Sequence, residues 1–303
     1  MLNKLNPQFI ELKTKDGLML PGLLYEPKMA KAAVIYLHGN GSSSVFYGAA
    51  EHQFDMASAL NEKGIAILYF NNRGAHLVHG FTIEQGKKRF RKRYGMGYEK
   101  IKECIIDIEG SISFLKKRGY KKFYLMGIST GANKICVYNY YRRKNDVEKY
   151  ILLAGGDDTG IHYHAFGKRK FFKLLSLAHR KVRQGYGDYI MPEVLPEIFS
   201  YAGFYDIANP DGDYNTFPFY EAMRNVKFST KPLFRYFKSI KKPSLVVYGS
   251  EDEYAWGDVS RAVCTLKKYQ PTLIYKIIKG SGHSFRGYSK ELADIVTNFL
   301  APE

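Results

Sequence analysis

One serine stands between two glycines where the chain changes from an apolar run to a segment of helical character. Residues 127–131, GISTG, lie within KKFYLMGISTGANKICVYNYY, with the apolar run just before them. A serine at a strand-to-helix turn is pushed out of the fold in strained backbone geometry, and the residues two positions away must be small. The helix that follows points N–H groups at whatever the serine attacks. We therefore predict that Ser129 is an exposed nucleophile.

A serine hydroxyl becomes a good nucleophile only when a base takes its proton. Of the eight histidines, His283 is the best placed, because it follows the last predicted strand in the loop KGSGHSF. The imidazole needs a carboxylate to fix its tautomer. We predict Asp252 for this role, in GSEDE after the run SLVVY. The alternatives left open are Glu251, Glu253 and, at another strand end, Asp157 and Asp158.

A serine attack on a carbonyl also needs N–H donors for the oxyanion that forms. The backbone N–H of Thr130, directly after the nucleophile, is one expected donor. The loop HGNG at residues 38–41 follows another apolar run and is flexible enough to supply the second. Asn40 is the candidate there, and since its main chain does this work, its side chain is free for another task.

Several further residues are candidates for substrate contact. His38 opens the HGNG loop, where holding the loop by hydrogen bonding is its expected role. The spacings of His76 with His79 and of His162 with His164 would bring two metal ligands together, but no third ligand is evident. We therefore expect no metal and no organic cofactor. The residues we assign to substrate binding are His38, Asp157, His162 and His164.

The rest of the chain alternates between apolar runs and segments of helical spacing. Short apolar runs predict buried strands at residues 32–37, 65–70, 123–126, 150–154, 245–248 and 274–278, and a strand pair at residues 9–25. Helical spacing occurs at residues 53–63, 98–119 and 292–300. This rhythm predicts an α/β fold, with a mostly parallel central sheet and helices on both faces.

The rhythm breaks once, between residues 155 and 243. That segment is rich in aromatic and basic residues, and structureless loops of such length are uncommon. We interpret it as an inserted helical cap, with residues 1–154 and 244–303 forming the core. Phe171, Leu174, Leu175, Ala178 and Val182 would share one face of a cap helix.

Composition narrows the class of protein. The formal net charge is +17, and basic residues concentrate at 87–93 and 168–183. A solvated basic surface is the simplest interpretation, since no nucleic-acid-binding motif accompanies the charge. No run approaches the roughly 20 apolar residues of a membrane span, and no signal peptide is indicated. The three cysteines form no disulfide framework, so a cytoplasmic protein is expected.

The order of these motifs resembles the α/β-hydrolase superfamily. His-Gly-x-Gly after one strand, G-x-S-x-G after another, then an aspartate and then a histidine follow its pattern, over about residues 8–301. The strand end FNNRG is similar to that of serine-aminopeptidase-like and acyl-esterase members. The resemblance implies Ser129 as nucleophile, Asp252 as acid, His283 as base, and Asn40 and Thr130 as oxyanion donors. A cap inserted after the strand that follows the nucleophile helix is also typical of the superfamily.

Three hypotheses of function follow. The first is a serine hydrolase of the carboxylesterase class acting on a small or medium ester, with an acidic or aromatic acyl group suggested by the basic, tyrosine-rich cap. The second is a peptidase or amidase, in which a carboxylate of the cap holds a substrate amino group, the candidates being Asp157, Asp158, Glu193 and Glu197. The third is a non-catalytic binding protein whose basic cap docks an anionic partner. Dimerisation is left open.

Overall fold

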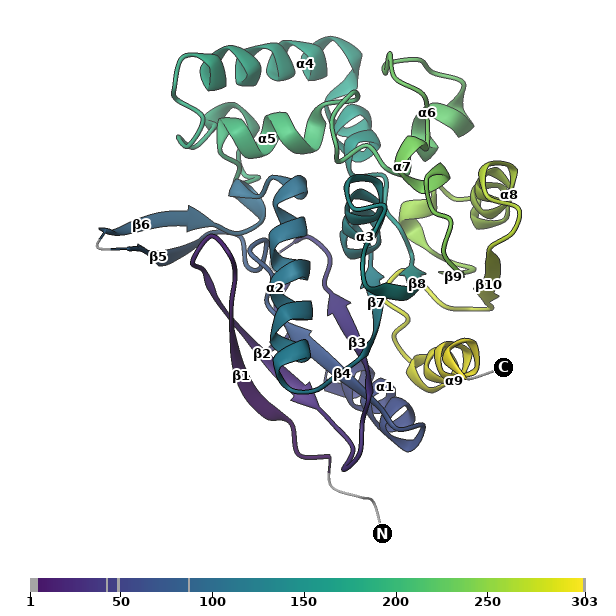
Figure 1. Ribbon diagram of the computed structural model, residues 1–303. Coiled ribbons are helices and arrows are strands. Elements are labelled where there is room, and N and C mark those ends of the chain that lie inside the picture. Colours follow the sequence, from purple (N-terminus) through teal and green to yellow (C-terminus); the bar gives the residue numbers. More distant parts are fainter. Residues whose placement is uncertain (1–4, 42, 48–49, 87, 302–303) are drawn as a thin grey trace.

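A computed structural model describes residues 5–41, 43–47, 50–86 and 88–301, and Figure 1 shows its arrangement. The strands are β1 (Gln8–Lys13), β2 (Met19–Tyr25), β3 (Ala32–Leu37), β4 (Ile65–Phe70), β5 (His79–Gln85), β6 (Lys88–Tyr94), β7 (Lys122–Ile128), β8 (Val147–Leu153), β9 (Ser244–Gly249) and β10 (Ile274–Ile278). The helices are α1 (Ala50–Glu62), α2 (Cys104–Lys117), α3 (Thr130–Tyr141), α4 (Asp158–Arg183), α5 (Tyr201–Ala208), α6 (Phe219–Arg224), α7 (Arg235–Lys238), α8 (Val259–Tyr269) and α9 (Ser289–Leu300), with short 3₁₀ turns η1 (Met96–Tyr98), η2 (Ile101–Glu103), η3 (Pro192–Val194) and η4 (Glu253–Ala255).

The main sheet has the strand order β1-β2-β4-β3-β7-β8-β9-β10. From β4 to β10 each strand runs parallel to its neighbours, whereas β2 is antiparallel to both β1 and β4. Residues 32–37, 65–70 and 244–249 form β3, β4 and β9, in which most side chains are buried, as expected of strands covered on both faces. The prediction of a mostly parallel central sheet is confirmed.

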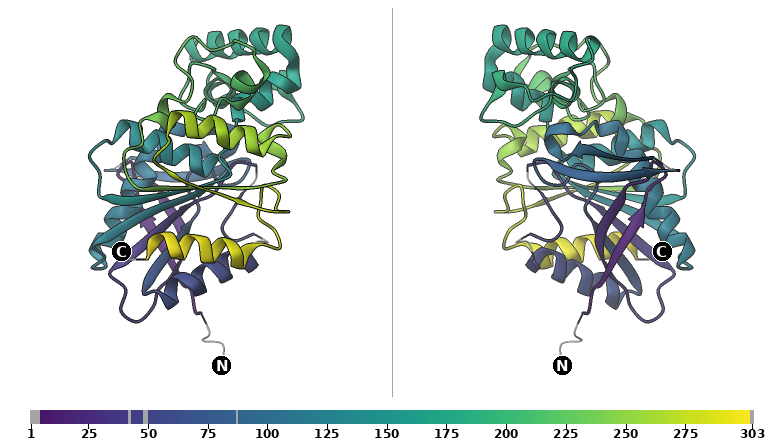
Figure 2. Two further views of the ribbon diagram at one scale, coloured as in Figure 1. Left: turned by 90° about the vertical axis from the view of Figure 1, so that its right-hand side faces the viewer. Right: turned by 90° about the vertical axis from the view of Figure 1, so that its left-hand side faces the viewer.

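Helices cover both faces of this sheet. Helices α1 and α9 pack side by side on one face, and α2, α3 and α8 lie on the other (Figure 2). The parallel strands all end at the same edge of the sheet, where the loops after β3, β7, β8, β9 and β10 come together. Ligand sites of α/β proteins form at this edge. None of the described helices is long and apolar enough to cross a membrane.

Residues 155–243, which we call the cap segment, connect β8 to β9 and contain α4, η3, α5, α6 and α7. Figure 1 shows α4 and α5 packed against each other beyond the edge where the parallel strands end. The predicted apolar face of α4 is present, because Phe171, Leu174 and Ala178 are buried. Gly167 interrupts that helix with a φ of 68°, so α4 bends there. The division of the chain into a core and a cap stays a prediction.

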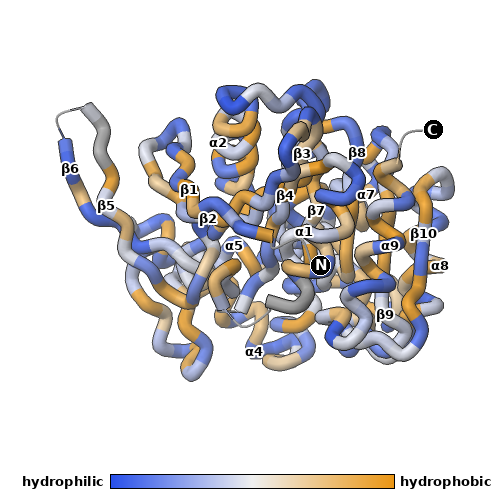
Figure 3. The backbone as a smooth tube through the Cα atoms, turned by 90° about the horizontal axis from the view of Figure 1, so that it is seen from below, coloured by the Kyte–Doolittle hydropathy of each residue, from blue (hydrophilic) through white to orange (hydrophobic). Residues whose placement is uncertain are grey.

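A feature absent from the sequence prediction is the hairpin of β5 and β6. Residues 88–93 of the basic run that we interpreted only as a charged cluster lie in strand β6, which pairs antiparallel with β5 from His79 opposite Tyr94 to Gln85 opposite Lys88. Residue 87 of that run lies outside the described residues. The hairpin projects beside β1, and β6 is largely hydrophilic (Figures 1 and 3). The sequence did not indicate this strand because most of its side chains are exposed cations, which give no pattern of buried apolar residues.

The strand end FNNRG places a buried cation beside the site loops. The side chain of Arg73 is 1% exposed, its Nη2 lies 2.7 Å from Oδ1 of Asp107 on α2, and its Nη1 lies 3.0 Å from Oδ2 of Asp16 in the β1–β2 turn. Two residues earlier, Oδ1 of Asn71 accepts a hydrogen bond from the Val45 N–H at 2.8 Å. These contacts hold the end of β4 in place. Loss of either carboxylate would leave the buried Arg73 charge only partly compensated, so the cluster resists disruption.

A carboxylate of the cap segment makes stability depend on pH. Oδ2 of Asp206 on α5 accepts a hydrogen bond from the Ile101 N–H at 2.8 Å, and burial, with Asp213 and Glu99 nearby, raises the pKa of Asp206 to about 7. The folded state therefore binds a proton that the unfolded state, with a pKa of 3.8, has released. The contribution of Asp206 to stability falls as pH rises from about 4 to about 7.

We expect Asp206→Asn to raise the melting temperature at pH 8 by about 2–5 °C and at pH 5 by roughly a third as much. The amide oxygen still accepts the Ile101 N–H, and the buried negative charge is gone. Thermal melts of both proteins at the two pH values measure the effect. Equal differences at pH 5 and pH 8 would contradict a role for ionisation.

Candidate active site

Ser129 occupies a sharp turn between β7 and α3. Its φ of 54° and ψ of −127° lie where residues with a side chain are rarely found, so the turn is strained and the hydroxyl is held out from the sheet edge. A Cβ at Gly127 would lie 2.4 Å from the Gly131 carbonyl carbon, and one at Gly131 would lie 2.0 Å from the Leu37 oxygen. Any larger residue at position 127 or 131 would therefore clash with the backbone, which explains why both neighbours of the serine turn are glycines.

His283 and Asp252 are hydrogen-bonded. Nδ1 of His283 lies 2.9 Å from Oδ1 of Asp252, whose side chain is 1% exposed. The same oxygen accepts the Tyr254 N–H at 2.9 Å, which holds the carboxylate in place at the start of η4. This arrangement leaves Nε2 as the free nitrogen of the imidazole.

The competing carboxylates occupy other positions. Oε2 of Glu253 accepts the backbone N–H of His283 at 3.1 Å, so Glu253 holds the histidine loop rather than the imidazole. Glu251 is exposed, and its backbone N–H pairs with the Ser281 oxygen at 2.9 Å. Asp157 and Asp158 lie at the start of α4 and bond to groups other than His283. Among the alternatives left open by the sequence, the geometry favours Asp252.

The two expected oxyanion donors are available. The backbone N–H groups of Asn40 and Thr130 donate no hydrogen bond within the described part of the chain. By contrast, the next N–H in the loop, that of Gly41, points to Sδ of Met96 at 3.1 Å. Oγ of Ser43 donates to the Asn40 oxygen at 2.8 Å and so helps to fix the loop. A Cβ at Gly39 would lie 2.9 Å from Cβ of Ser129, which shows how closely this loop approaches the serine.

Ser129 and His283 line the same cavity, of about 410 Å³. Its walls come from the loops after β3, β7, β8, β9 and β10 and from the cap segment. The remaining lining residues are Gly39, Asn40, Gly41, Ser43, Met96, Ile128, Gly156, Asp158, Ile161, His162, Glu197, Phe199, Ile207, Tyr254 and Ser284. They include two carboxylates and no lysine or arginine, although the chain carries 46 lysines and arginines.

The residues assigned to substrate binding separate into two groups. His162 lines the cavity, stacked against Phe166, and burial lowers its pKa to about 4, so the ring is neutral at pH 7. The other three, His38, Asp157 and His164, are not among the residues that line it.

Each of these three has a local partner instead. A ring nitrogen of buried His38 lies 2.8 Å from the Gly39 oxygen, in keeping with the expected role in holding the loop, and burial lowers the pKa of His38 to about 3. Asp157 caps α4 through the Gly160 N–H. His164 is exposed and lies 3.4 Å from the Tyr220 hydroxyl.

Two residues of the cavity make contacts that the sequence did not indicate. The ring of Tyr254 packs edge-on against His283 with centroids 4.5 Å apart, and it helps to orient the imidazole. Asp158 was named only as an alternative acid or amine anchor, but it lies in the cavity and accepts hydrogen bonds from Thr130. Burial raises the pKa of Asp158 to about 7. Nothing in the spacing of the sequence indicates either contact.

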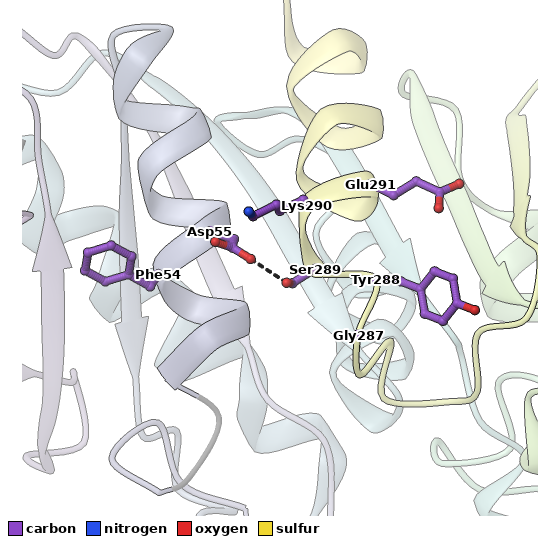
Figure 4. A pocket seen from close by; sticks show the side chains of 7 residues that line it. All are labelled: Phe54, Asp55, Gly287, Tyr288, Ser289, Lys290 and Glu291. Atoms are coloured by element: carbon purple, nitrogen blue, oxygen red, sulfur yellow. Dashed lines mark hydrogen bonds between the residues drawn. The ribbon is translucent and has the colours of Figure 1, made fainter. Parts of the chain in front are cut away.

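A larger cavity, of about 800 Å³, lies between α1 and α9 (Figure 4). Its lining includes Asp55 and Ser289, and Oγ of Ser289 donates to Oδ2 of Asp55 at 2.5 Å. The described residues that line this cavity include no histidine to act as the base for a serine nucleophile. We therefore place the candidate active site at the cavity that Ser129 and His283 line, although it is the smaller of the two.

Comparison with known proteins agrees with the fold described above. Est1E from Butyrivibrio proteoclasticus, in a structure with bound ferulic acid, aligns with a TM-score of 0.62 and 17% identity over 96% of this chain and 97% of that one. Esterase Pf2001 from Pyrococcus furiosus aligns with a TM-score of 0.57 and 19% identity over 98% and 92%. The chain thus has the α/β-hydrolase fold, and the resemblance seen in its sequence is confirmed.

Residues 91–300 match the model of the family described as "Protein of unknown function (DUF1749)", and the chain belongs to this family. A Mycoplasma pneumoniae protein named "Putative esterase/lipase 2" is 24% identical over 278 residues, which cover 91% of each chain.

Proposed function

We propose that this protein is a serine hydrolase that cleaves carboxylic esters of small or medium size. The observation that carries the proposal is the shared cavity of Ser129 and His283, with His283 Nδ1 2.9 Å from Asp252. An exposed serine on a strained turn, a base at the same cavity and a carboxylate behind that base are the parts that acyl transfer requires. The esterase names among the similar proteins give further support.

The proposed reaction proceeds through an acyl-enzyme. Ser129 Oγ attacks the ester carbonyl carbon while its proton passes to His283 Nε2, and Asp252 stabilises the imidazolium. The oxyanion accepts the N–H groups of Asn40 and Thr130. The C–O bond to the alcohol then breaks, and His283 returns the proton to the leaving oxygen. Water, activated by His283, attacks the acyl carbon and releases the acid and Ser129.

The lining of the cavity narrows the substrate class. We propose a substrate whose acyl group is uncharged or cationic, because Asp158 and Glu197 line the cavity and no lysine or arginine is among its lining residues. Asp158 contributes its negative charge above its raised pKa of about 7. This differs from the acidic acyl group that the basic cap suggested. An aromatic acyl group remains compatible with Phe199 and Tyr254, which also line it. The cations of α4 and β6 lie outside this lining.

Short p-nitrophenyl esters provide the test of this proposal. We expect the wild-type protein to hydrolyse p-nitrophenyl acetate and butyrate, and a His283→Ala variant to lose most of that activity. At pH 8, where Asp158 is largely ionised, an acyl chain of equal length that ends in a carboxylate should react at least about tenfold more slowly, since burial beside like charge costs more than about 1 kcal/mol. No turnover of any ester would overturn the proposal, and preference for the anionic ester would overturn the assignment of charge.

A peptidase or amidase remains a second candidate because of the same two carboxylates. Of the anchors considered for a substrate amino group, Asp158 and Glu197 line the cavity, whereas Asp157 and Glu193 do not. Aminoacyl p-nitroanilides, measured beside the matching esters, separate the two activities. Faster turnover of the anilide would place the protein among the amidases.

A further inference from the structure

Both proposed oxyanion donors belong to residues whose side chains are bound by the cap segment. Nδ2 of Asn40 lies 3.4 Å from the hydroxyl oxygen of Tyr214. Oγ1 of Thr130 lies 3.1 Å from each carboxylate oxygen of Asp158. Asp158 lies near the start of the cap segment and Tyr214 between α5 and α6, and each contacts one of the two residues that supply the proposed oxyanion donors.

Tyr214 is itself held by a buried chain of polar contacts. Its hydroxyl donates to Oε2 of Glu99 at 2.9 Å, and Oε1 of Glu99 lies 2.7 Å from Nζ of Lys134 on α3. Lys134 also donates to Oδ1 of Asn72 at 3.0 Å. Tyr214, Glu99, Lys134 and Asn72 are each at most 1% exposed. Buried charges are costly without well-placed partners. Moving the Tyr214 hydroxyl would remove a partner from the buried Glu99 carboxylate, so the network holds that hydroxyl in place.

The Thr130 side has a second tie between the cap segment and α3. Nδ2 of Asn133 donates to Oδ2 of Asp158 at 3.0 Å and to the Gly156 oxygen at 2.8 Å. Thr130 and Asn133 lie on the first turn of α3. Asp158 therefore joins the start of α4 to the turn that carries Ser129.

We propose that Tyr214 and Asp158 are positioning residues that hold the two oxyanion donors in place, so that the docked cap segment completes the oxyanion hole. This inference rests on the proposed esterase function. Tyr214 is not among the residues that line the cavity, so it acts through Asn40 rather than by touching substrate. The side chain of Asn40 serves this anchoring while its main chain serves the reaction.

Displacing an oxyanion donor is expected to raise the free energy of the transition state more than that of the bound ester. A displaced donor weakens the bond to the oxyanion, which exists only after attack, and leaves the binding of the uncharged ester almost unchanged. Complete loss of one donor costs about 10²–10³-fold in kcat, and a displacement costs part of that. We expect Tyr214→Phe to lower kcat about 10–100-fold with KM changed less than about threefold.

The experiment combines Tyr214→Phe with Asn40→Ala, which removes the anchored amide and keeps the backbone N–H. If Tyr214 acts through Asn40, the two single variants lose similar amounts of kcat and the double variant loses little more. A trifluoromethyl ketone, which forms the tetrahedral adduct, should bind each variant more weakly in proportion to kcat. Tyr201→Phe is the matched control, because its hydroxyl contacts Glu193 within the cap segment. Asp158→Ala should lower kcat, and Asp158→Asn, which keeps one acceptor for Thr130, should restore much of it.

Each outcome decides one question. If the wild-type protein shows no ester turnover, the proposed esterase function itself is overturned. Wild-type turnover with unchanged kcat in Tyr214→Phe, or with strictly multiplicative losses in the double variant, overturns the positioning role. Should Tyr214→Phe melt far below the wild type, Asn40→Ala carries the test, because its kcat must then fall while the protein stays folded.

Discussion

Ser129→Ala is expected to lower kcat/KM for p-nitrophenyl butyrate at least about 10⁴-fold. The side chain is partly exposed at the turn between β7 and α3. Ser43 and Ser284 also line the cavity, but of these three serines Ser129 alone has the strained backbone with positive φ. Without Oγ no acyl-enzyme forms, and only the polar surroundings of the cavity remain to assist water. Initial rates at equal protein concentration measure the loss.

Ser289→Ala serves as the matched control for this substitution. Ser289 lies in the larger cavity between α1 and α9, where its hydroxyl donates to Asp55 (Figure 4). Its removal should leave ester hydrolysis within about twofold of the wild type, because the site lies elsewhere. Retention of activity in Ser129→Ala would exclude Ser129 as the nucleophile. A large loss of ester hydrolysis in Ser289→Ala would instead indicate that the larger cavity between α1 and α9 contains the active site.

Asp252→Asn is expected to cost about 10³–10⁴-fold in kcat with the fold retained. Oδ1 of Asp252 faces Nδ1 of His283 at 2.9 Å, and Oδ2 is buried with no hydrogen-bond partner among the described residues. An amide in this position no longer stabilises the imidazolium that forms when Ser129 attacks, and its NH₂ group favours the wrong tautomer of His283. Steady-state kinetics together with a thermal melt separate this effect from unfolding.

Glu251→Gln provides the comparison for Asp252→Asn. It removes a neighbouring carboxylate that is exposed and whose side chain makes no hydrogen bond to a described residue. We expect activity close to that of the wild type. Similar losses in the two variants would mean that the negative charge of the whole loop, rather than the bond to His283, supports the reaction.

The sequence was sufficient to predict the elements that obey local rules. The nucleophile turn could be found because strand, glycine, serine, glycine and helix follow one another within residues 123–141, and the geometry at Ser129 depends on those neighbours. The buried strands were found because both of their faces are covered, which gives continuous apolar runs. Asp252 was separable from Glu251 and Glu253 only in three dimensions, because one residue of turn decides which carboxylate faces the imidazole.

Contacts between distant segments could not be predicted in this way. Tyr214 and Asn40 are 174 positions apart, and Lys134 and Asn72 are 62 apart. The polar groups of this buried network look like ordinary surface residues in the sequence, where burial is not visible. The β5–β6 hairpin was missed because its exposed cations mask strand periodicity. His38 and Asp157 were assigned to the substrate by their place after strand ends, and His164 by its place in the cap two residues from His162. Each of the three contacts a local partner instead.

The central claim, that Ser129 is an activated nucleophile, is tested most directly by intact-mass measurement after treatment with a small alkyl fluorophosphonate. Such a probe phosphonylates a serine whose proton is taken by a neighbouring base. We expect a single adduct on the wild-type protein, located in the peptide that contains Ser129, and no adduct on folded Ser129→Ala. A wild-type protein that stays unmodified, or an adduct that persists on Ser129→Ala, would contradict this claim.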